Sequence, residues 1–502
     1  MICVSLGRTR HKMMMAEHKA VAERGAELVE LRLDWLSHSP DLGRLLNGRP
    51  TPVVVTCRRA RDKGLWRWNE EQRLTVLRSA IVSGAEYVDL EEDIAGSIRR
   101  FGPTKRIVSF HDFEQTPETL EEIHARMQKL DPDIIKIVTM ANSPIDNVRM
   151  LKLVAAAKIP TIGFCMGEFG IPSRILTGRY GAPFTYATFN KDRTMAPGQL
   201  TLEEMRDVFH YDRIDRQTEL YGVLADPVAH SMSPLIHNAA FAHEKLNKVY
   251  LPFRVPADAL AATIDSYEWF PVQGYSVTLP HKEGLLELTD KYAGPVREIG
   301  AANTLYKASD NGWCAANTDH DAALESLIRE LNPELAAGTD VSLSALAGRK
   351  VLILGAGGVA RAIAHGIVSH GGVLMIANRT KARAEALAKQ LGCLLVEWQN
   401  RGSVFADVLV NCTSVGMHPN LDESPFAENW LREGMVVFDT IYNPERTLLI
   451  KQARDRQCKT ITGVEMFVRQ AARQFELFTG RTAPDDVMRG VLRKAISAVR
   501  ID

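Results

Sequence analysis

A lysine lies in the middle of a short apolar run, Asp-Ile-Ile-Lys-Ile-Val at 133–138, and this residue, Lys136, could carry out covalent chemistry. Burial in an apolar strand removes the hydration of an ammonium and disfavours its charged form, which leaves some neutral amine at pH 7. A neutral amine can attack a carbonyl and form a Schiff base. A structural role is also open, in which the lysine reaches a strand end or pairs with a buried carboxylate.

Short apolar, β-branched runs recur through the first part of the chain. They lie at 2–6, 28–33, 53–56, 86–90, 106–110, 134–138, 161–164 and 185–189. Stretches with helical spacing separate them, for example at 116–130 and 143–157. Eight strands alternating with helices predict an α/β fold, a closed (β/α)8 TIM barrel, whose chemistry gathers at the C-terminal ends of the strands.

Polar side chains follow several of these predicted strands. They are Glu30, Arg32, Arg58, Asp89, Glu91, His111, Lys136 and, as a softer group, Met166. A barrel with a central lysine and a nearby histidine suits imine chemistry, because the histidine can move protons while the amine holds the substrate.

Six short motifs in the first 200 residues resemble the type I 3-dehydroquinate dehydratases. They are Glu30-Leu-Arg32, Thr56-Cys-Arg58, Phe110-His-Asp-Phe113, Ile135-Lys-Ile137, Pro172-Ser-Arg-Ile175 and Ala196-Pro-Gly-Gln199. The resemblance implies that Lys136 forms an imine with the substrate ketone and that His111 moves protons. It further implies that Arg174, Gln199, Ser5, Glu30, Arg32 and Arg58 bind the carboxylate and hydroxyl groups. An arginine fork suits a carboxylate well.

Two positions depart from that family's pattern. The family often has Glu-Gly-Gly shortly after the Thr-x-Arg motif, whereas this chain has Asp62 in the run 61–64. The family usually has serine before Ala-Pro-Gly-Gln, and here Met195 stands there, with Thr194 one place earlier. These changes put affinity and turnover in question more than the type of reaction.

Composition excludes several function classes. The 502 residues exceed the size of one ordinary domain, and 61 basic residues balance 61 acidic ones. No basic surplus points to nucleic acid or to an anionic membrane, and no apolar run approaches membrane-spanning length. Seven scattered cysteines without a Cys-x-x-Cys pair favour reduced thiols in the cytoplasm, and no histidine–carboxylate spacing indicates a metal site.

A short charged stretch at 211–219 separates the barrel from a new apolar run that begins at Leu220. We therefore expect a barrel domain at 1–214 and a second domain at 215–502, tethered closely by a short joint. Within the second domain we expect a substrate-binding lobe at 220–320 with C-terminal helices at 463–500, and a nucleotide-binding lobe at 321–462. The stretch 331–349 is predicted to be a loop insertion.

The clearest local motif of the second domain is a strand, a glycine turn and a helix start at 350–362. Gly355, Ala356, Gly357, Gly358 and Val359 form the turn, which lets a pyrophosphate approach the backbone at a helix N-terminus. Glycine-rich turns also occur for structural reasons. The next strand, at 373–377, ends in Asn378-Arg379-Thr380, followed by Arg383, where an NAD site would have an acidic residue. The charge favours NADP as the cofactor.

A larger set of motifs around this turn resembles shikimate dehydrogenase along residues 220–490. The motifs lie at 221–238, 276–282, 300–304, 316–319, 411–417, 439–444 and 463–470. The resemblance predicts a two-lobed unit in which an α/β substrate lobe joins a Rossmann NADP-binding lobe.

This second resemblance implies that Lys282 and Asp319 form the catalytic pair. A positioned ammonium would stabilise the charge that develops on the substrate oxygen during hydride transfer and could supply a proton. Other residues are implied to bind the carboxylate (Ser231, Ser233), the ring hydroxyls (Thr278, Asn303, Tyr442, Gln470) and the nicotinamide side of the cofactor (Thr413, Met417, Gly463). Ser276 replaces the usual asparagine, and His320 follows Asp319 where glycine is common.

Single residues have simpler interpretations. Lys282 could be a surface charge, and His230, His237 and His281 are more typical of loop or core histidines than of ligands. For the whole chain, three rivals stand beside the fused enzyme: a quinate-oxidising second domain, a class I aldolase on the barrel, and a metabolite sensor without turnover. The catalytic groups argue against the sensor, since Lys136, His111, Lys282 and Asp319 are all present.

The sequence therefore predicts two consecutive steps of the shikimate pathway, in aromatic amino acid biosynthesis. The first domain would dehydrate 3-dehydroquinate to 3-dehydroshikimate, and the second would reduce 3-dehydroshikimate to shikimate with NADPH. The expected partners are these small molecules, with no nucleic acid and no membrane, and the expected location is the cytoplasm. The oligomeric state stays open, with a monomer slightly favoured.

Overall fold

The computed structural model describes residues 1–332 and 346–497. The greater part of the loop insertion predicted at 331–349 lies outside the described residues. The chain divides into two compact units. One consists of residues 1–220, 226–231 and 247–272, and the other of 221–225, 232–246 and 273–502.

Eight parallel strands form the barrel predicted at the N-terminal end. The strands are β1 (Ile2–Leu6), β2 (Leu28–Arg32), β3 (Val53–Thr56), β4 (Tyr87–Glu91), β5 (Lys105–Asp112), β6 (Ile134–Met140), β7 (Thr161–Met166) and β8 (Thr185–Thr188). Their order is β7-β6-β5-β4-β3-β2-β1-β8, so the hydrogen-bonded ladder runs almost fully round, with β7 and β8 at its two ends. Each predicted strand is present, within one or two residues of its predicted start.

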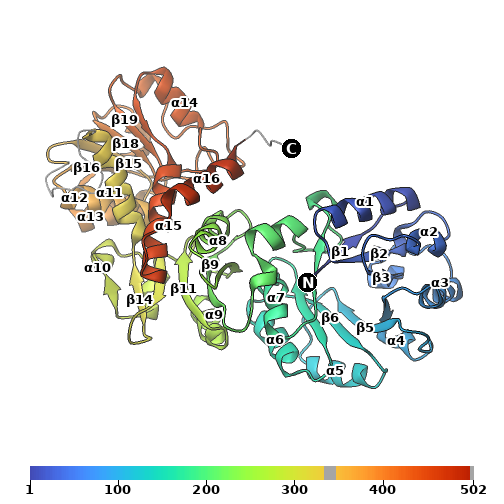
Figure 1. Cartoon of the computed structure of the whole chain (residues 1–502). Coiled ribbons are helices and arrows are strands. Elements are labelled where there is room, and N and C mark those ends of the chain that lie inside the picture. Colours follow the sequence, from blue (N-terminus) through green and yellow to red (C-terminus); the bar gives the residue numbers. More distant parts are fainter. Residues whose placement is uncertain (333–345, 498–502) are drawn as a thin grey trace. The chain divides into compact units, whose positions relative to one another are not determined.

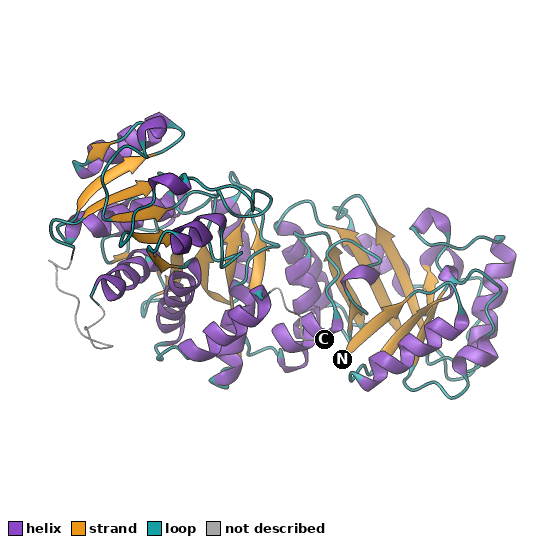
Figure 2. Ribbon diagram, turned by 90° about the horizontal axis from the view of Figure 1, so that it is seen from above, coloured by secondary structure: helices purple, strands orange, loops and turns teal. Residues whose placement is uncertain are grey.

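Helices follow most of these strands and lie outside them (Figures 1 and 2). They are α1 (His11–Glu23), α2 (Leu42–Leu46), α3 (Glu70–Val82), α4 (Glu92–Ala95), α5 (Leu120–Gln128), α6 (Ile145–Ala156) and α7 (Ile171–Leu176). The start of α3 shows how local sequence fixes a helix end. Asn69 and Gln72 form a capping box, in which each side chain accepts a hydrogen bond from the other residue's backbone N–H.

Side chains at every second position of the strands point inward and fill the barrel interior. The residues at every second position, such as Ile134 and Val138 on β6, belong to one buried apolar cluster. Lys136 lies between them on the same face, because side chains of a strand alternate. The barrel therefore places this lysine inside the molecule, and the apolar layer below it excludes water.

A six-stranded mixed sheet follows the barrel in sequence. Its strands are β9 (Glu219–Ala225), β10 (Lys248–Arg254), β11 (Val272–Val277), β12 (Tyr292–Ala293), β13 (Thr304–Lys307) and β14 (Trp313–Ala316), in the order β10-β9-β11-β13-β14-β12. The helices of this region are α8 (Ser233–His243), α9 (Leu260–Ser266) and α10 (Val296–Ile299).

A second six-stranded sheet is entirely parallel and has the order β17-β16-β15-β18-β19-β20. Its strands are β15 (Lys350–Leu354), β16 (Val373–Ala377), β17 (Leu394–Leu395), β18 (Val408–Asn411), β19 (Val436–Asp439) and β20 (Lys459–Ile461). The chain enters the sheet at β15, moves outward to β17, and then crosses over to β18. This order places a topological switch point between β15 and β18, where doubly wound folds bind nucleotides.

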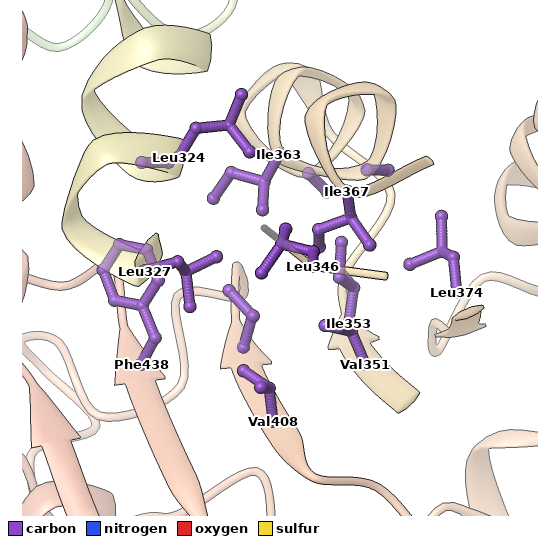
Figure 3. Packing of buried hydrophobic residues seen from close by; sticks show 14 of the residues in the cluster. Leu324, Leu327, Leu346, Val351, Ile353, Ile363, Ile367, Leu374, Val408 and Phe438 are labelled. Atoms are coloured by element: carbon purple, nitrogen blue, oxygen red, sulfur yellow. The ribbon is translucent and has the colours of Figure 1, made fainter. Parts of the chain in front are cut away.

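Helices cover both faces of this parallel sheet, whose strands are largely apolar and buried. They include α11 (Thr318–Leu331), α12 (Gly358–Ser369), α13 (Lys381–Leu391) and α14 (Leu448–Asp455). The chain continues with α15 (Gly463–Thr479) and α16 (Asp485–Ile496), and α16 packs on α8 and α15. Figure 3 shows the packing on one face, where Leu324 and Leu327 of α11 and Ile363 of α12 meet Ile353 of β15. None of the helices in the described residues has the length and hydropathy needed to cross a bilayer.

Candidate active sites

One cavity of the barrel gathers every site residue that the sequence predicted there. Its lining includes Ser5, Glu30, Arg32, Arg58, His111, Lys136, Arg174 and Gln199. These residues come from strands β1, β2, β5 and β6, from the segment after β3, from α7 and from the loop after β8. The C-terminal ends of parallel strands meet at one end of a barrel, which explains why residues so far apart in sequence share one cavity.

Two carboxylates surround the Lys136 ammonium. Its Nζ lies 3.0 Å from Asp89 Oδ2 and 3.7 Å from Glu30 Oε1. All three residues are buried. The alternative in which this lysine pairs with a buried carboxylate is thus confirmed as a description of its contacts. Lys136 also lines a cavity together with other polar groups, and the predicted imine chemistry requires such surroundings.

Asp89 is one of the residues that the sequence analysis named at a strand end without giving it a site role. It accepts hydrogen bonds from Arg58 Nη2 at 2.9 Å and from Ser109 Oγ at 2.6 Å. Burial by itself would raise the pKa of Asp89, but the charges of Arg58 and Lys136 outweigh burial and hold that pKa well below its usual range. The carboxylate is therefore a permanent negative charge beside the lysine.

His111 lines the same cavity from β5, the strand next to that of Lys136. Its ring stacks on Phe113, with 5.9 Å between the ring centroids. Burial, followed by the positive charges of Arg58 and Lys136, lowers the pKa of His111 well below 6.5. The imidazole is therefore neutral at pH 7 and able to accept a proton.

Arg174 is a buried cation that has no carboxylate partner among the described residues. Its Nη1 donates to the carbonyl of Tyr186 at 3.4 Å, and within the same part of the chain its Nε and Nη2 have no hydrogen-bond partner. Burial lowers the pKa of Arg174 to about 10, so it still carries its charge at pH 7. An unsatisfied buried guanidinium that lines a cavity is prepared to bind an anionic group.

Both departures in the barrel sequence fall at this cavity. Asp62 and Met195 line it, together with Lys63. Asp62 pairs with Arg59, while Arg32 Nη1 lies 3.8 Å from Met195 Sδ. The methionine thus occupies space beside a predicted substrate-binding arginine.

The second unit contains a buried ion pair between Lys282 and Asp319. Lys282 Nζ lies 2.5 Å from Asp319 Oδ2, and both side chains are buried. Asp319 lies in the first turn of α11, where the Asn317 side chain caps the helix by accepting from the backbone N–H of His320. The pairing contradicts the alternative in which Lys282 is a surface charge.

Asn303 lies in the same hydrogen-bonded region. Its side chain bonds with Thr318, which is next to Asp319, and its Nδ2 donates to Gln470 Oε1 at 3.4 Å. The backbone carbonyl of Lys282 accepts from Ala302, the residue before Asn303. Four predicted residues, Lys282, Asp319, Asn303 and Gln470, are thereby brought together.

The remaining predicted residues of this domain lie at element ends. Thr278 follows β11, and Tyr442 follows β19 and stacks on Phe467 of α15 with 4.0 Å between centroids. Ser233 begins α8. Ser231 lies in the loop at 226–231, after β9. This loop, unlike most of β9, belongs to the same compact unit as the barrel. Ser276 donates to Gln474 Oε1 at 2.6 Å, and His320 Nε2 lies 3.3 Å from His365 Nδ1.

The loop at 226–231 has a well-defined anchor within that unit. Glu168, two residues after β7, accepts hydrogen bonds from the backbone N–H groups of Val228 at 3.0 Å and Ala229 at 2.8 Å. Arg254 joins the same carboxylate at 3.2 Å and Asp226 at 2.8 Å. A carboxylate that accepts two consecutive N–H groups and an arginine holds a loop firmly.

The glycine turn after β15 has the geometry of a dinucleotide site. Gly355 has φ +119°, and a Cβ there would come within 2.9 Å of the Cys412 carbonyl, so the position requires glycine. At Gly357, by contrast, a Cβ would meet open space. Ala356, Gly358 and Val359 complete the turn into α12, whose N-terminus presents free N–H groups to an anion.

The nucleotide turn adjoins the buried ion pair. A Cβ on Gly358 would lie 3.0 Å from Cδ of Lys282, so glycine permits close packing of the turn on the lysine stem. Thr413 and Met417 follow β18, on the other side of the switch point. Gly463 begins α15, where a Cβ would lie 2.4 Å from the Ile441 carbonyl.

Two arginines at the end of β16 fit the 2′-phosphate of NADP. Arg379 and Arg383 are exposed, and neither has an ion-pair partner in the part of the chain that the structure describes. Arg379 lies in the short turn between β16 and α13, where Asn378 Nδ2 donates to the Thr380 carbonyl at 2.8 Å, and Arg383 lies in the first turn of α13. The residues present therefore fit NADP, with free positive charge where an NAD site has a carboxylate.

Comparison with known protein families supports both resemblances, that of the barrel and that of the second domain. Residues 2–216 match the family model for type I 3-dehydroquinase, residues 223–305 that for the shikimate dehydrogenase substrate binding domain, residues 338–439 that for shikimate/quinate 5-dehydrogenase, and residues 463–493 that for the shikimate 5′-dehydrogenase C-terminal domain.

Individual relatives cover the chain in whole or in part. A chloroplastic bifunctional 3-dehydroquinate dehydratase/shikimate dehydrogenase from Arabidopsis thaliana is 36% identical over 98% of this chain and 84% of its own length. An NADP(+) shikimate dehydrogenase from Moorella thermoacetica is 39% identical over 57% of this chain and 96% of its own. A solved shikimate dehydrogenase in complex with NADP+ has a TM-score of 0.51 at 34% identity and covers 57% of this chain and 98% of its own.

Proposed function

This chain belongs to the family of bifunctional 3-dehydroquinate dehydratase/shikimate dehydrogenases, and on that premise we propose how its residues perform the two reactions. It combines a type I 3-dehydroquinate dehydratase with an NADP-dependent shikimate dehydrogenase. The proposed limits are 1–214 for the dehydratase and 215–502 for the dehydrogenase. The observation that carries the proposal is the presence of the Arg174 guanidinium in the cavity of Lys136, because both substrate groups, a carboxylate and a ketone, have a partner there.

In the dehydratase, the neutral amine of Lys136 adds to the ketone carbon of 3-dehydroquinate. The oxygen of the resulting carbinolamine takes up the proton that the Lys136 ammonium released and leaves as water, so that an iminium remains on Nζ. His111, neutral at pH 7, takes a proton from the adjacent carbon, and the electron pair of that C–H bond enters the iminium to give an enamine.

The enamine then expels the substrate hydroxyl group, which leaves as water with a proton from the His111 imidazolium. Hydrolysis of the new iminium releases 3-dehydroshikimate and restores Lys136. Arg174 binds the carboxylate throughout. Gln199, Ser5, Glu30, Arg32 and Arg58 bind the substrate's other oxygen atoms.

In the dehydrogenase, Asp319 orients the Lys282 ammonium toward the substrate carbonyl oxygen. NADPH supplies the hydride when it is bound. Lys282 stabilises the negative charge that grows on the oxygen and gives it a proton, so that 3-dehydroshikimate becomes shikimate. Ser231 and Ser233 bind the carboxylate, while Thr278, Asn303, Tyr442 and Gln470 bind the ring hydroxyls.

We further propose that the partners are only these small molecules, that the chain is a monomer, and that it acts in the cytoplasm. All seven cysteines lie in the described residues and are free thiols, which suits a reducing compartment.

A single assay tests the combined function. Purified chain supplied with 3-dehydroquinate and NADPH should consume NADPH, measured by its absorbance, and form shikimate. Consumption with 3-dehydroshikimate but not with 3-dehydroquinate would contradict the dehydratase half. Activity with quinate but not shikimate, in the oxidation direction, would support the rival quinate enzyme.

Cofactor choice gives a second prediction. A charge-assisted hydrogen bond contributes about 1.5–3 kcal/mol, so Arg379→Ala should raise the KM for NADPH roughly tenfold or more. The KM for NADH should change less than about twofold, because NADH lacks the 2′-phosphate. Steady-state kinetics with both cofactors measure the difference.

Lys381 provides the matched control for this experiment. It lies between the two arginines and is also exposed, but it pairs with Glu397 at 2.6 Å. Lys381→Ala should therefore leave both KM values nearly unchanged. If Arg379→Ala raises the two KM values equally, the arginine supports the loop and does not read the phosphate.

A further inference from the structure

A tyrosine ring lies under the Nζ atom of Lys136. Tyr186 belongs to β8, lines the barrel cavity and is only 3% exposed. The distance from Lys136 Nζ to the centroid of this ring is 4.0 Å, well inside the range of a cation–π contact. Two neighbouring rings hold the tyrosine in place, Phe164 at 6.2 Å and Phe184 at 5.7 Å between centroids. The ring is thus fixed against the atom that reacts.

The contact completes the electrostatic surroundings of Nζ. Asp89 and Glu30 approach the nitrogen as carboxylates, and the ring contributes the negative face of its π system. The Tyr186 hydroxyl is buried, and the described residues offer it no hydrogen-bond partner. Burial, with the nearby charge of Glu30, raises the pKa of Tyr186 well above 10, so the phenol stays neutral. What Tyr186 offers Nζ is therefore a ring face.

We propose that Tyr186 is a further catalytic residue of the dehydratase, whose ring stabilises positive charge on the Lys136 nitrogen. This inference rests on the Schiff base chemistry proposed above. When the amine adds to the ketone and the oxygen leaves as water, the nitrogen gains a bond to the substrate carbon and carries one positive charge. The nitrogen remains bonded to the same side chain, so the ring that faces the ammonium also faces the iminium.

A ring whose π face is less negative should change the reaction in two ways. The ammonium would release its proton more easily, so imine formation would begin at a lower pH. The iminium would also form less readily from its neutral precursor, the carbinolamine, so the rate at high pH would fall. Simple damage to packing would lower the rate and leave the pH midpoint where it was.

Fluorinated phenylalanines test the ring without changing its shape. Tyr186→Phe serves as the reference, and one, two or three ring fluorines then weaken the π face stepwise. A cation–π contact of ordinary strength predicts that three fluorines lower the high-pH dehydration rate roughly threefold to tenfold and shift the pH midpoint downward by about half to one unit. Both effects should grow with the number of fluorines.

Tyr87 provides a matched control position. It is a partly buried residue that packs against the same barrel interior cluster and on Phe184, but its ring lies near Lys105. The same fluorine series at residue 87 should leave the pH midpoint unmoved. A series at residue 186 that behaves like the series at residue 87 would overturn the proposal.

The phenylalanine reference should fold, since it removes only a hydroxyl that has no partner within the described residues. Shikimate oxidation by the same preparations checks folding of the chain. Borohydride labelling of the unaltered chain separates the two hypotheses. If Lys136 is not labelled with substrate, the Schiff base mechanism fails. If it is labelled but fluorination has no effect, only the role of Tyr186 fails.

Discussion

Lys136→Ala is expected to abolish dehydration of 3-dehydroquinate, with a loss of at least about a thousandfold in kcat, because Lys136 is the amine proposed to form the imine. Borohydride added with substrate or product should attach one ligand mass to Lys136 in the unaltered chain and none in the variant. Peptide mass spectrometry locates the label. Shikimate oxidation should stay near normal, since the Lys282 site lies on other elements.

Lys63 is the control for this experiment, because its side chain lines the same cavity. Lys63→Arg removes the amine and keeps the charge, and it should preserve the label on Lys136. A label on Lys63, or on any lysine other than Lys136, would contradict the assignment. The removal of Lys136 also leaves Asp89 and Glu30 without their ammonium, so circular dichroism should accompany the assay.

The second large effect concerns the dehydrogenase. Asp319→Asn keeps the shape of the side chain but removes the charge that holds the Lys282 ammonium at 2.5 Å. A positioned acid–base group contributes on the order of 10²–10⁴ to a rate, so we expect kcat for shikimate oxidation to fall by about that factor. Dehydration by the same protein should remain within about twofold, which makes it an internal measure of folding.

Asp321 offers the comparison, since it lies two residues farther along α11 and bonds with His320 at 2.7 Å. Asp321→Asn should cost little shikimate oxidation. Equal losses from the two variants would mean that charge near the start of the helix matters, rather than the contact with Lys282. A normal kcat in Asp319→Asn would remove the aspartate from the mechanism.

The sequence predicts the fold well where one local signal is enough. Barrel strands such as β1, β3 and β7 are buried along their whole length, so each is a nearly continuous apolar run that is easily recognised between helical stretches. The glycine turn after β15 is equally clear, because Gly355 needs a positive φ and a close backbone approach. The eight barrel residues share a cavity, as predicted, because parallel strands bring their C-terminal ends together.

Other parts of the site depend on partners distant in sequence. Asp89 meets Lys136 across 47 positions, and only the register of β4, β5 and β6 brings the two together. Tyr186 has the pattern of an ordinary core residue in a β-strand, and its place under Nζ follows from the closure of β8 against β1. No local pattern carries this information, since it arises from packing.

The anchor at Glu168 bears on what fusion of the two activities means. It joins residue 168, which precedes the proposed domain limit, to the loop at 226–231, which follows it. In one polypeptide this contact forms at the high effective concentration that a short tether imposes. In two separate chains cut near Asp215, this anchor and other contacts across the cut, such as Tyr180 with Trp269 and Tyr267 with Pro144, would have to sustain a bimolecular association at the cost of translational freedom. The covalent joint therefore lowers the entropy cost of fixing the loop at 226–231. This loop carries Ser231, one of the residues proposed to bind the carboxylate.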